Sequence, residues 1–142
     1  VLIYDNNLKM IAAIHAGWKG AFKDIVKQVI KFMIKKGCSV ENMTAVIGPS
    51  ISQKNYEVKE DFKKKFIKKD RNNLKYFKNS KKKLYFDLTK YIYSSFKTTA
   101  VKYIDVLKID TYDPKNKFFS ARRAIKLKHG DYGRNISIMM LN

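Results

Sequence analysis

The strongest constraint on the fold is an amphipathic segment between two groups of short strand-like runs. Its apolar residues recur every three or four positions, which predicts an α-helix over Ala21–Lys36 that Gly37 ends. Before it, Leu2–Tyr4 and Lys9–His15 predict two β-strands joined by a turn. After it, Thr44–Ile47 predicts a buried strand that ends at a Gly-Pro turn. A helix between strands favours a fold that mixes both kinds of element.

The rest of the chain continues this mixture without a regular repeat. A second, more polar helix is predicted over Glu57–Lys69, followed by a Lys- and Asn-rich loop over about Lys68–Lys83. Asp87 is placed to cap a third helix. The last predicted elements are a strand, an extended piece and an apolar closing strand: Tyr103–Ile109, Phe118–Arg123 and Gly133–Leu141. Because no strict βαβ repeat is present, the sequence predicts an α+β (mixed α/β) fold in one domain over residues 1–142.

Apolar stretches and cysteine content bound the environment of the protein. The longest apolar stretches, Met10–Ile14 and Ile136–Leu141, are far shorter than the roughly 20 residues that span a bilayer. The single cysteine, Cys38, rules out an internal disulfide framework and fits a reducing compartment, where we expect it as a buried, inert thiol. We therefore expect a cytoplasmic location and no membrane partner.

The net charge of +19 suggests nucleic-acid binding, but the kind of basic residue argues against a specific site. The 31 basic residues include only 4 arginines. Proteins that read nucleic acids favour arginine for bidentate contacts with phosphates and guanine edges. Lysine, isoleucine, asparagine and tyrosine are residues that an AT-rich genome encodes readily. We interpret the lysines as a solvated surface with weak, salt-sensitive affinity for polyanions. A basic nucleic-acid-binding module remains the alternative.

Three of the four arginines, Arg122, Arg123 and Arg134, lie within the last 21 residues. In a chain that otherwise uses lysine, a guanidinium suggests a role that a point charge does not fill. Such roles are bidentate binding of phosphate or carboxylate and stacking on a flat ring. A structural role in ion pairs is the competing interpretation.

His15 ends a predicted strand and opens a turn that contains Gly17 and Gly20. This position projects a side chain beyond a sheet edge, and the glycines allow a close approach of backbone or ligand. A single histidine is more often a structural residue than a metal ligand, and Trp18 is more often a core residue than a platform for a cofactor.

Three segments taken together indicate a family. They are His-Ala-Gly-Trp-Lys-Gly at 15–20, Ile-Gly-Pro-Ser-Ile at 47–51 with Tyr-Glu-Val at 56–58, and Phe-Phe-Ser-Ala-Arg-Arg at 118–123 with Gly-Arg at 133–134. In order and spacing they resemble the laccase-domain family, first called polyphenol oxidase-like. Its members are described as purine nucleoside phosphorylases with adenosine deaminase and methylthioadenosine phosphorylase activity. The resemblance implies layered mixed β-sheets flanked by helices, with adenosine, inosine, methylthioadenosine and phosphate as substrates.

The resemblance also implies a mononuclear metal site, usually zinc, with two histidines and one cysteine as ligands. His15 matches one of these ligands and is the expected catalytic metal-binding residue. The other two lie in the family before the strand that Val1 matches, so the domain is expected to be incomplete at its N-terminus. Copper is less favoured, because the sequence has no His-x-His pair and no blue-copper Cys–Met set. Arg122, Arg123 or Arg134 is expected to hold phosphate or to neutralise charge that develops during the reaction.

The sequence departs from the family pattern at three positions. Asp110 stands where the family usually has cysteine, Ala121 where it has tyrosine, and Lys19 where arginine is common. The changes affect the details of substrate contact rather than the expected fold. A catalytically inert remnant of the family is the alternative to a working enzyme.

Overall fold

The computed structural model describes residues 1–141 and divides the chain into two compact units. The four-stranded unit contains Val1–Gly48, Lys90–Leu107 and the residues from Ser137 onward. The hairpin unit contains Pro49–Thr89 and Lys108–Ile136. The prediction of one domain over residues 1–142 stays a prediction. None of the helices formed by residues 1–141 has the length and apolarity needed to cross a membrane.

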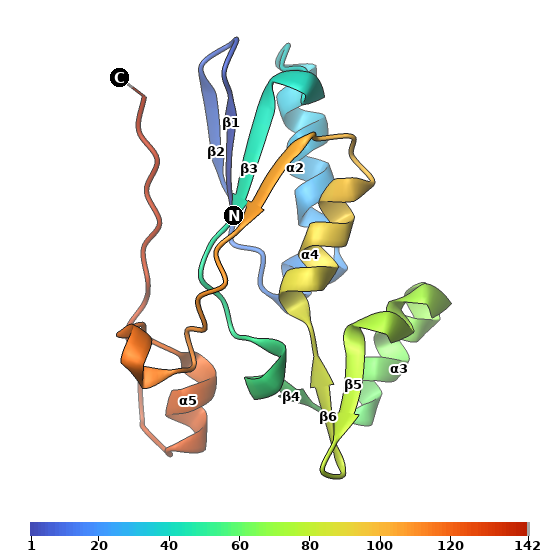
Figure 1. The fold of residues 1–142 in the computed structure, drawn as a ribbon, viewed down its shortest axis with the longest axis vertical. Coiled ribbons are helices and arrows are strands. Elements are labelled where there is room, and N and C mark those ends of the chain that lie inside the picture. The colour runs from blue at the N-terminus through green and yellow to red at the C-terminus, as the bar shows by residue number, and fades with distance from the viewer. Residues whose placement is uncertain (142) are drawn as a thin grey trace. The chain divides into compact units, whose positions relative to one another are not determined.

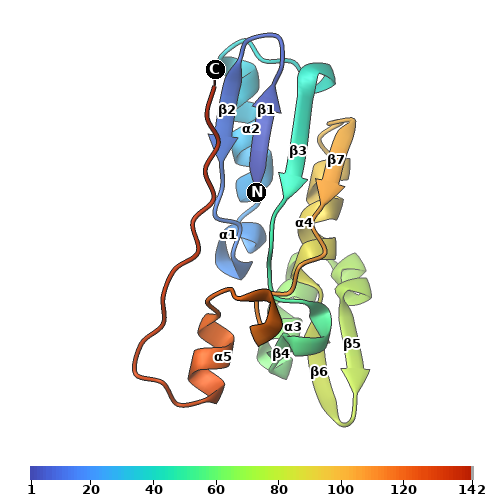
Figure 2. The same cartoon turned by 60° about the vertical axis from the view of Figure 1, so that its left-hand side comes forward.

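The four-stranded unit is built on a mixed sheet with the order β2-β1-β3-β7 (Figure 2). Its strands are β1 (Leu2–Asp5), β2 (Met10–Ala13), β3 (Met43–Ile47) and β7 (Tyr103–Val106). β1 pairs antiparallel with both β2 and β3, whereas β3 and β7 run parallel. All four strands lie where the sequence predicted them, with ends that differ by at most three residues.

One face of this sheet is covered by α2 and α4 (Figure 1). The predicted helix Ala21–Lys36 is divided into α1 (Trp18–Phe22) and α2 (Ile25–Lys35). The division is caused by Asp24, which adopts left-handed backbone angles (φ 60°, ψ 35°) that no α-helix continues through. α4 (Leu88–Lys97) begins directly after Asp87, as predicted. The core is largely aliphatic: Ile3, Val26, Ile30, Met33, Met43, Ala45, Ile92 and Phe96 are all buried.

A buried carboxylate fixes the turn between β1 and β2. Asp5 is fully buried and accepts hydrogen bonds from the backbone N–H groups of Asn7, Leu8 and Ser39. Burial alone would raise the pKa of Asp5, but these donors outweigh it and hold the pKa below its ordinary value. Cys38 is buried as predicted, and burial followed by the nearby Asp5 charge raises the pKa of its thiol. A raised pKa keeps this thiol protonated and unreactive.

The hairpin unit contains a three-stranded antiparallel sheet with the order β4-β6-β5. Its strands are β4 (Glu57–Val58), β5 (Phe77–Ser80) and β6 (Lys83–Phe86). The predicted loop over Lys68–Lys83 is wrong in its second half, which forms β5 and the start of β6. The strand pattern was hidden because lysine, asparagine and serine occupy most positions of β5.

An aromatic cluster forms the core of the hairpin unit. α3 (Glu60–Lys69) contributes Phe62 and Phe66, which stack on each other at 4.7 Å and pack against Phe77 of β5 and Phe86 of β6 at ring-centroid distances of 4.8–6.1 Å. α3 begins three residues after the predicted start at Glu57, because Glu57 and Val58 pair with β6 instead. Short 3₁₀ turns complete the chain: η1 (Val40–Asn42), η2 (Gln53–Asn55), η3 (Arg71–Tyr76) and η4 (Pro114–Asn116).

The two last predicted elements are corrected by the structure. The extended piece Phe118–Arg123 is wrong from Ala121 on, where α5 (Ala121–Lys126) begins. Ser120 caps this helix by accepting a hydrogen bond from the Arg123 N–H, a signal that the two preceding phenylalanines obscured. The closing strand Gly133–Leu141 is also wrong, because residues 133–141 form no regular structure. Most of its apolar side chains are exposed, Ile138 to 72%, so an apolar run alone did not produce a strand where no strand of residues 1–141 pairs with it. The two sheets and several helices confirm the α+β class.

Candidate functional site

His15 lies in the four-stranded unit, between the end of β2 and the start of α1. Its side chain is exposed and folds over Gly17. A Cβ atom at position 17 would lie 3.0 Å from His15 Nε2, closer than ordinary packing allows. Gly17 therefore makes room for the imidazole, which gives this glycine of the His-Ala-Gly-Trp segment a physical function.

The residues 1–141 do not form a metal centre by themselves. They contain no group of three or more His, Cys, Asp or Glu side chains placed to hold a metal ion. Cys38 does not join His15 in such a set, because it is buried with its Sγ 3.4 Å from the sulfur of Met10. A catalytic zinc takes three protein ligands, and one imidazole gives neither the geometry nor the affinity that it needs. The role of His15 as a metal ligand stays a prediction.

Arg123 is anchored within the hairpin unit. Its Nη1 donates to the carbonyl oxygens of Thr111 and Tyr112 at 3.0 and 2.9 Å, and its Nη2 donates to the Phe118 carbonyl at 2.6 Å. These bonds tie α5 to the segment before it. Three of the five guanidinium donors thus satisfy backbone carbonyls, which favours a structural role for Arg123 over phosphate binding.

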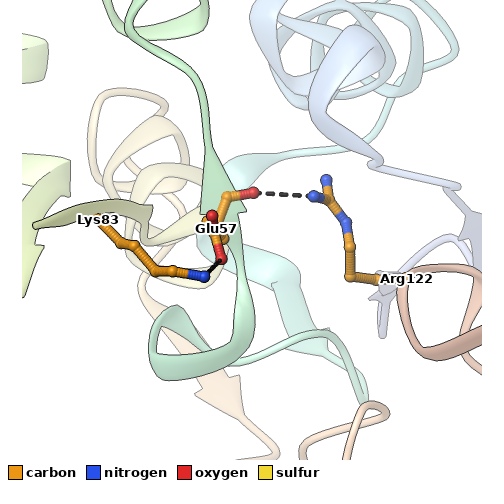
Figure 3. Close-up of polar contacts among 3 residues, drawn as sticks. All are labelled: Glu57, Lys83 and Arg122. Carbon is orange, nitrogen blue, oxygen red and sulfur yellow. Dashed lines mark hydrogen bonds and ion pairs between the residues drawn. The ribbon is translucent and has the colours of Figure 1, made fainter. Parts of the chain in front are cut away.

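Arg122 presents its guanidinium differently (Figure 3). Its side chain is exposed, and Nη1 donates to the backbone carbonyl of Glu57 at 2.8 Å. The guanidinium carbon lies 5.1 Å from the ring centroid of Tyr56, a cation–π distance. The Glu57 carboxylate is turned to Lys83, with 2.8 Å between Oε2 and Nζ. Arg122 is thus oriented by an aromatic ring and a backbone carbonyl, while the nearby carboxylate is paired with a lysine.

Tyr56 is the buried ring on which Arg122 lies. It packs edge-on against Phe86 and Phe62 at 6.0 and 6.4 Å. Burial raises the pKa of the Tyr56 hydroxyl, and the charge and hydrogen bonding of Arg122 offset only part of this effect. The aromatic core of the hairpin unit therefore ends in a neutral phenol that supports the arginine.

Arg134 is exposed and stacks on Tyr132, with its guanidinium carbon 4.1 Å from the ring centroid. The neighbouring Gly133 lies against Phe119, so that a Cβ there would be 2.6 Å from the ring. Asn135 both accepts from the Phe119 N–H, at 2.9 Å, and donates to the Phe119 carbonyl, at 2.8 Å. The Phe-Phe-Ser-Ala-Arg-Arg segment and the Gly-Arg pair are thus neighbours in space.

Sequence reasoning noted Asp110 only as a departure and missed its function in the structure. Its carboxylate accepts from the Ser52 N–H (3.1 Å), the Ser52 hydroxyl (2.5 Å), the Asn55 amide (2.7 Å) and the Tyr112 N–H (2.9 Å). Burial would raise the pKa of Asp110, but these donors hold it below its ordinary value. Asp110 fastens the segment after the Gly-Pro turn to the segment that Arg123 holds. In the sequence, the only hint of this role was the presence of two short donor side chains, Ser52 and Asn55, after the Gly-Pro turn.

The fold and these motif segments place the chain in a class of α+β proteins. Comparison with known proteins shows which family this is. The model of the family described as multi-copper polyphenol oxidoreductase laccase matches residues 1–142, and the chain belongs to this family. The family is associated with a metal through the copper in its description.

Relatives of named function and a solved structure agree with this membership. The chain is 38% identical over 138 residues to a purine nucleoside phosphorylase of Rickettsia conorii. The aligned region covers 96% of this chain and 56% of the phosphorylase. It is 34% identical over 68 residues to the adenosine deaminase RL5 of an unknown prokaryotic organism, and this alignment covers 48% of the chain and 26% of the deaminase. The crystal structure of the hypothetical protein YfiH of Bacillus licheniformis superposes with a TM-score of 0.76 at 26% identity, covering 86% of this chain and 48% of that one. The chain spans about half the length of the phosphorylase and of the YfiH chain.

Proposed function

We propose that the protein acts on purine nucleosides as a phosphorylase, with adenosine deaminase and methylthioadenosine phosphorylase activity in addition. The observation that carries the proposal is the 38% identity to a purine nucleoside phosphorylase over 96% of the chain. The similarity to an adenosine deaminase over about half of the chain supports the second activity. The substrates proposed are adenosine, inosine, methylthioadenosine and inorganic phosphate.

Arg122 is the residue that we propose for phosphate binding. In phosphorolysis, phosphate attacks the ribose C1′ while the purine base leaves, so a cation must hold the phosphate oxygens. Arg122 has an exposed guanidinium that Tyr56 and the Glu57 carbonyl orient, whereas Arg123 uses three donors for carbonyl groups. Arg134 is exposed and remains a second candidate.

A metal requirement is a separate part of the proposal. We propose zinc rather than copper as the family metal here, with the exposed imidazole of His15 as one of its ligands. Zinc would supply a Lewis acid and a water of lowered pKa for deamination. Because only His15 among residues 1–141 matches a ligand position of the family, we assign no position to the ion. A cytoplasmic location likewise stays a proposal.

The test is phosphate-dependent release of purine base by the protein as its gene encodes it, purified with and without added zinc. Adenosine, inosine and methylthioadenosine are the substrates, and Arg122→Lys is run beside the unchanged protein. We expect release to require phosphate, and Arg122→Lys to raise the KM for phosphate about tenfold or more, because lysine does not replace a bidentate contact. Folded, zinc-loaded protein that releases no base would instead support the inert remnant. Release with an unchanged KM for phosphate in Arg122→Lys would remove this residue from the site.

A further inference from the structure

Positive charge is distributed unevenly between the two units. The hairpin unit has 21 basic and 8 acidic residues, a net charge of +13 in 70 residues. The four-stranded unit has 10 basic and 4 acidic residues, a net charge of +6 in 72 residues. A compositional bias alone would give two units of nearly equal length similar charges. The excess in the hairpin unit therefore requires another explanation.

The excess is densest along α3 and η3. Residues 63–75 include 7 basic residues and a single acidic one, Asp70. Six of the basic side chains are exposed, and we call them the α3–η3 basic surface: Lys64, Lys65, Lys68, Lys69, Arg71 and Lys75. α3 turns Phe62 and Phe66 toward the hairpin, so Lys64 and Lys68, one helical turn apart, lie on its solvent side.

Structural roles account for only a part of this surface. Lys68 and Lys69 lie in the last turn of α3, where positive charge interacts favourably with the helix dipole. Lys63, outside the surface, pairs with Glu60 at 3.6 Å. The carboxylate of Asp70 accepts a hydrogen bond from the Asn72 N–H and caps η3. Lys64 and Arg71 lie outside these last turns, whereas Lys75 lies in the last turn of η3 with its Nζ 5.2 Å from the Tyr76 ring centroid. Positive charge therefore outweighs the single acidic residue, Asp70, along residues 63–75.

The residue types on the α3–η3 basic surface indicate which kind of polyanion it would bind. Lysine provides point charges that contact phosphates without reading base edges. The aromatic rings of this region, Phe62, Phe66 and Tyr76, lie inside the unit or half-buried and offer no exposed platform for base stacking. Leu74 is the one exposed large apolar residue within residues 63–75, which is too little for insertion into a membrane. A paired nucleic acid, which presents phosphates and hides its bases, fits best.

We infer that the α3–η3 basic surface binds the phosphate backbone of double-stranded nucleic acid without sequence preference. This binding is independent of the proposed activity on nucleosides. Its affinity falls steeply with salt, because each neutralised phosphate releases counterions. Duplex DNA and duplex RNA share this phosphate chemistry, and separate measurements with each distinguish them.

The test compares two variants that remove the same charge from different units. Lys64, Lys68, Arg71 and Lys75 are changed together to Gln in the hairpin unit. The matched control changes Lys23, Lys31, Lys35 and Lys36 to Gln, which are exposed residues in and beside α2 of the four-stranded unit. Gln has nearly the helix propensity of Lys, so both variants are expected to keep their circular dichroism spectra. Fluorescence anisotropy measures the binding of each protein to duplexes of random sequence, about 20 base pairs long, over a range of salt concentrations.

We expect the hairpin variant to bind duplex at least about tenfold more weakly near 0.1 M salt, and the control to change by less than about twofold. On DNA, the slope of log affinity against log salt concentration should become shallower by about 0.9 for each phosphate that the variant no longer neutralises. Equal weakening in both variants would show that binding follows total charge and would overturn the inference. Undiminished binding in the hairpin variant would overturn it too, as would tighter binding of the unchanged protein to anionic lipid vesicles than to duplex.

Discussion

The two units of the molecule achieve stability by different means. In the four-stranded unit, strand ladders and aliphatic packing between α2, α4 and the sheet hold most of the chain, and Asp5 fixes one turn. In the hairpin unit, an aromatic cluster holds α3 and the small sheet. Its second segment, residues 108–136, contains only η4 and the six-residue α5. There, a few side chains bond to backbone: Asp110, Asn116, Arg123 and Asn135. Residues of the family motifs in that segment therefore fix its backbone conformation, in addition to being candidates for substrate contact.

Removing a ring from the aromatic cluster should have the largest effect. Phe66 is fully buried among three other rings, and Phe66→Ala should lower the free energy of unfolding by about 3–5 kcal/mol. Urea denaturation followed by circular dichroism measures the loss. Phe32→Ala is the control, because Phe32 is 58% exposed and should cost less than about 1 kcal/mol. Similar losses for both variants would show that the rings do not form the core of the hairpin unit.

Replacing Asp110 should have the next largest effect, about 2–3 kcal/mol for Asp110→Asn, since four donors lose a charged acceptor. The pKa of Asp110 is lowered in the folded protein, so its contribution is fully present above the unfolded value of about 3.9. That contribution is lost as the pH falls through the folded pKa.

Unfolding in urea at a series of acidic pH values checks this dependence. Asp110→Asn should lose part of the acid sensitivity and leave the share that comes from Asp5. Asp5→Asn is the matching change in the four-stranded unit, where the pKa of the carboxyl is lowered in the same direction. If the free energy of unfolding of Asp110→Asn depended on pH as in the unchanged protein, the Asp110 carboxylate would not hold this segment as its hydrogen bonds indicate.

The two adjacent arginines should separate stability from ligand binding. Arg123→Lys should lower the free energy of unfolding by about 1–2 kcal/mol, because one ammonium does not reach three carbonyls as the planar fork does. Arg122→Lys should change stability by less than about 1 kcal/mol, since Arg122 is exposed and makes one backbone bond. Thermal melts of both variants measure the difference. The reverse order would show that Arg122 rather than Arg123 anchors α5.

A substitution at Gly133 should have the smallest effect. The Cβ of Gly133→Ala would lie 2.6 Å from the Phe119 ring, but Phe119 is 55% exposed and is free on one side to shift. A loss of about 1 kcal/mol follows from such local repacking. A melt compared with Gly130→Ala, where no atom lies within 4 Å of the new Cβ, measures it. A larger loss would mean that Phe119 is fixed more firmly than its exposure indicates.

Sequence reasoning succeeded where side-chain periodicity and packing coincide. The strands of the four-stranded unit and the start of α4 after Asp87 were predicted from apolar spacing and capping. Periodicity failed at Asp24, because a single left-handed residue interrupts a helix without changing the apolar pattern around it. It failed again at β5, whose polar residues gave no alternation. At residues 133–141 an apolar run was present, but no strand among residues 1–141 pairs with it.

The candidate site was predictable only as a set of motifs. His15 was selected by its place in the His-Ala-Gly-Trp segment, and Arg122, Arg123 and Arg134 by the scarcity of arginine and by their matched motif. Neither criterion reveals where hydrogen bonds go. The difference between Arg122 and Arg123 depends on which carbonyls lie within about 3 Å of each guanidinium. The function of Asp110 depends on Ser52 and Asn55, which are 58 and 55 residues away in sequence. Such long-range partners are determined by the fold rather than by local pattern.

The most direct test of the central claim is the release of hypoxanthine from inosine by the zinc-supplemented protein as its gene encodes it, measured with and without inorganic phosphate. A purine nucleoside phosphorylase transfers the ribosyl group to phosphate, so we predict release only with phosphate and one ribose 1-phosphate formed per base. Release that is independent of phosphate, or no release by folded and zinc-loaded protein, would contradict the claim.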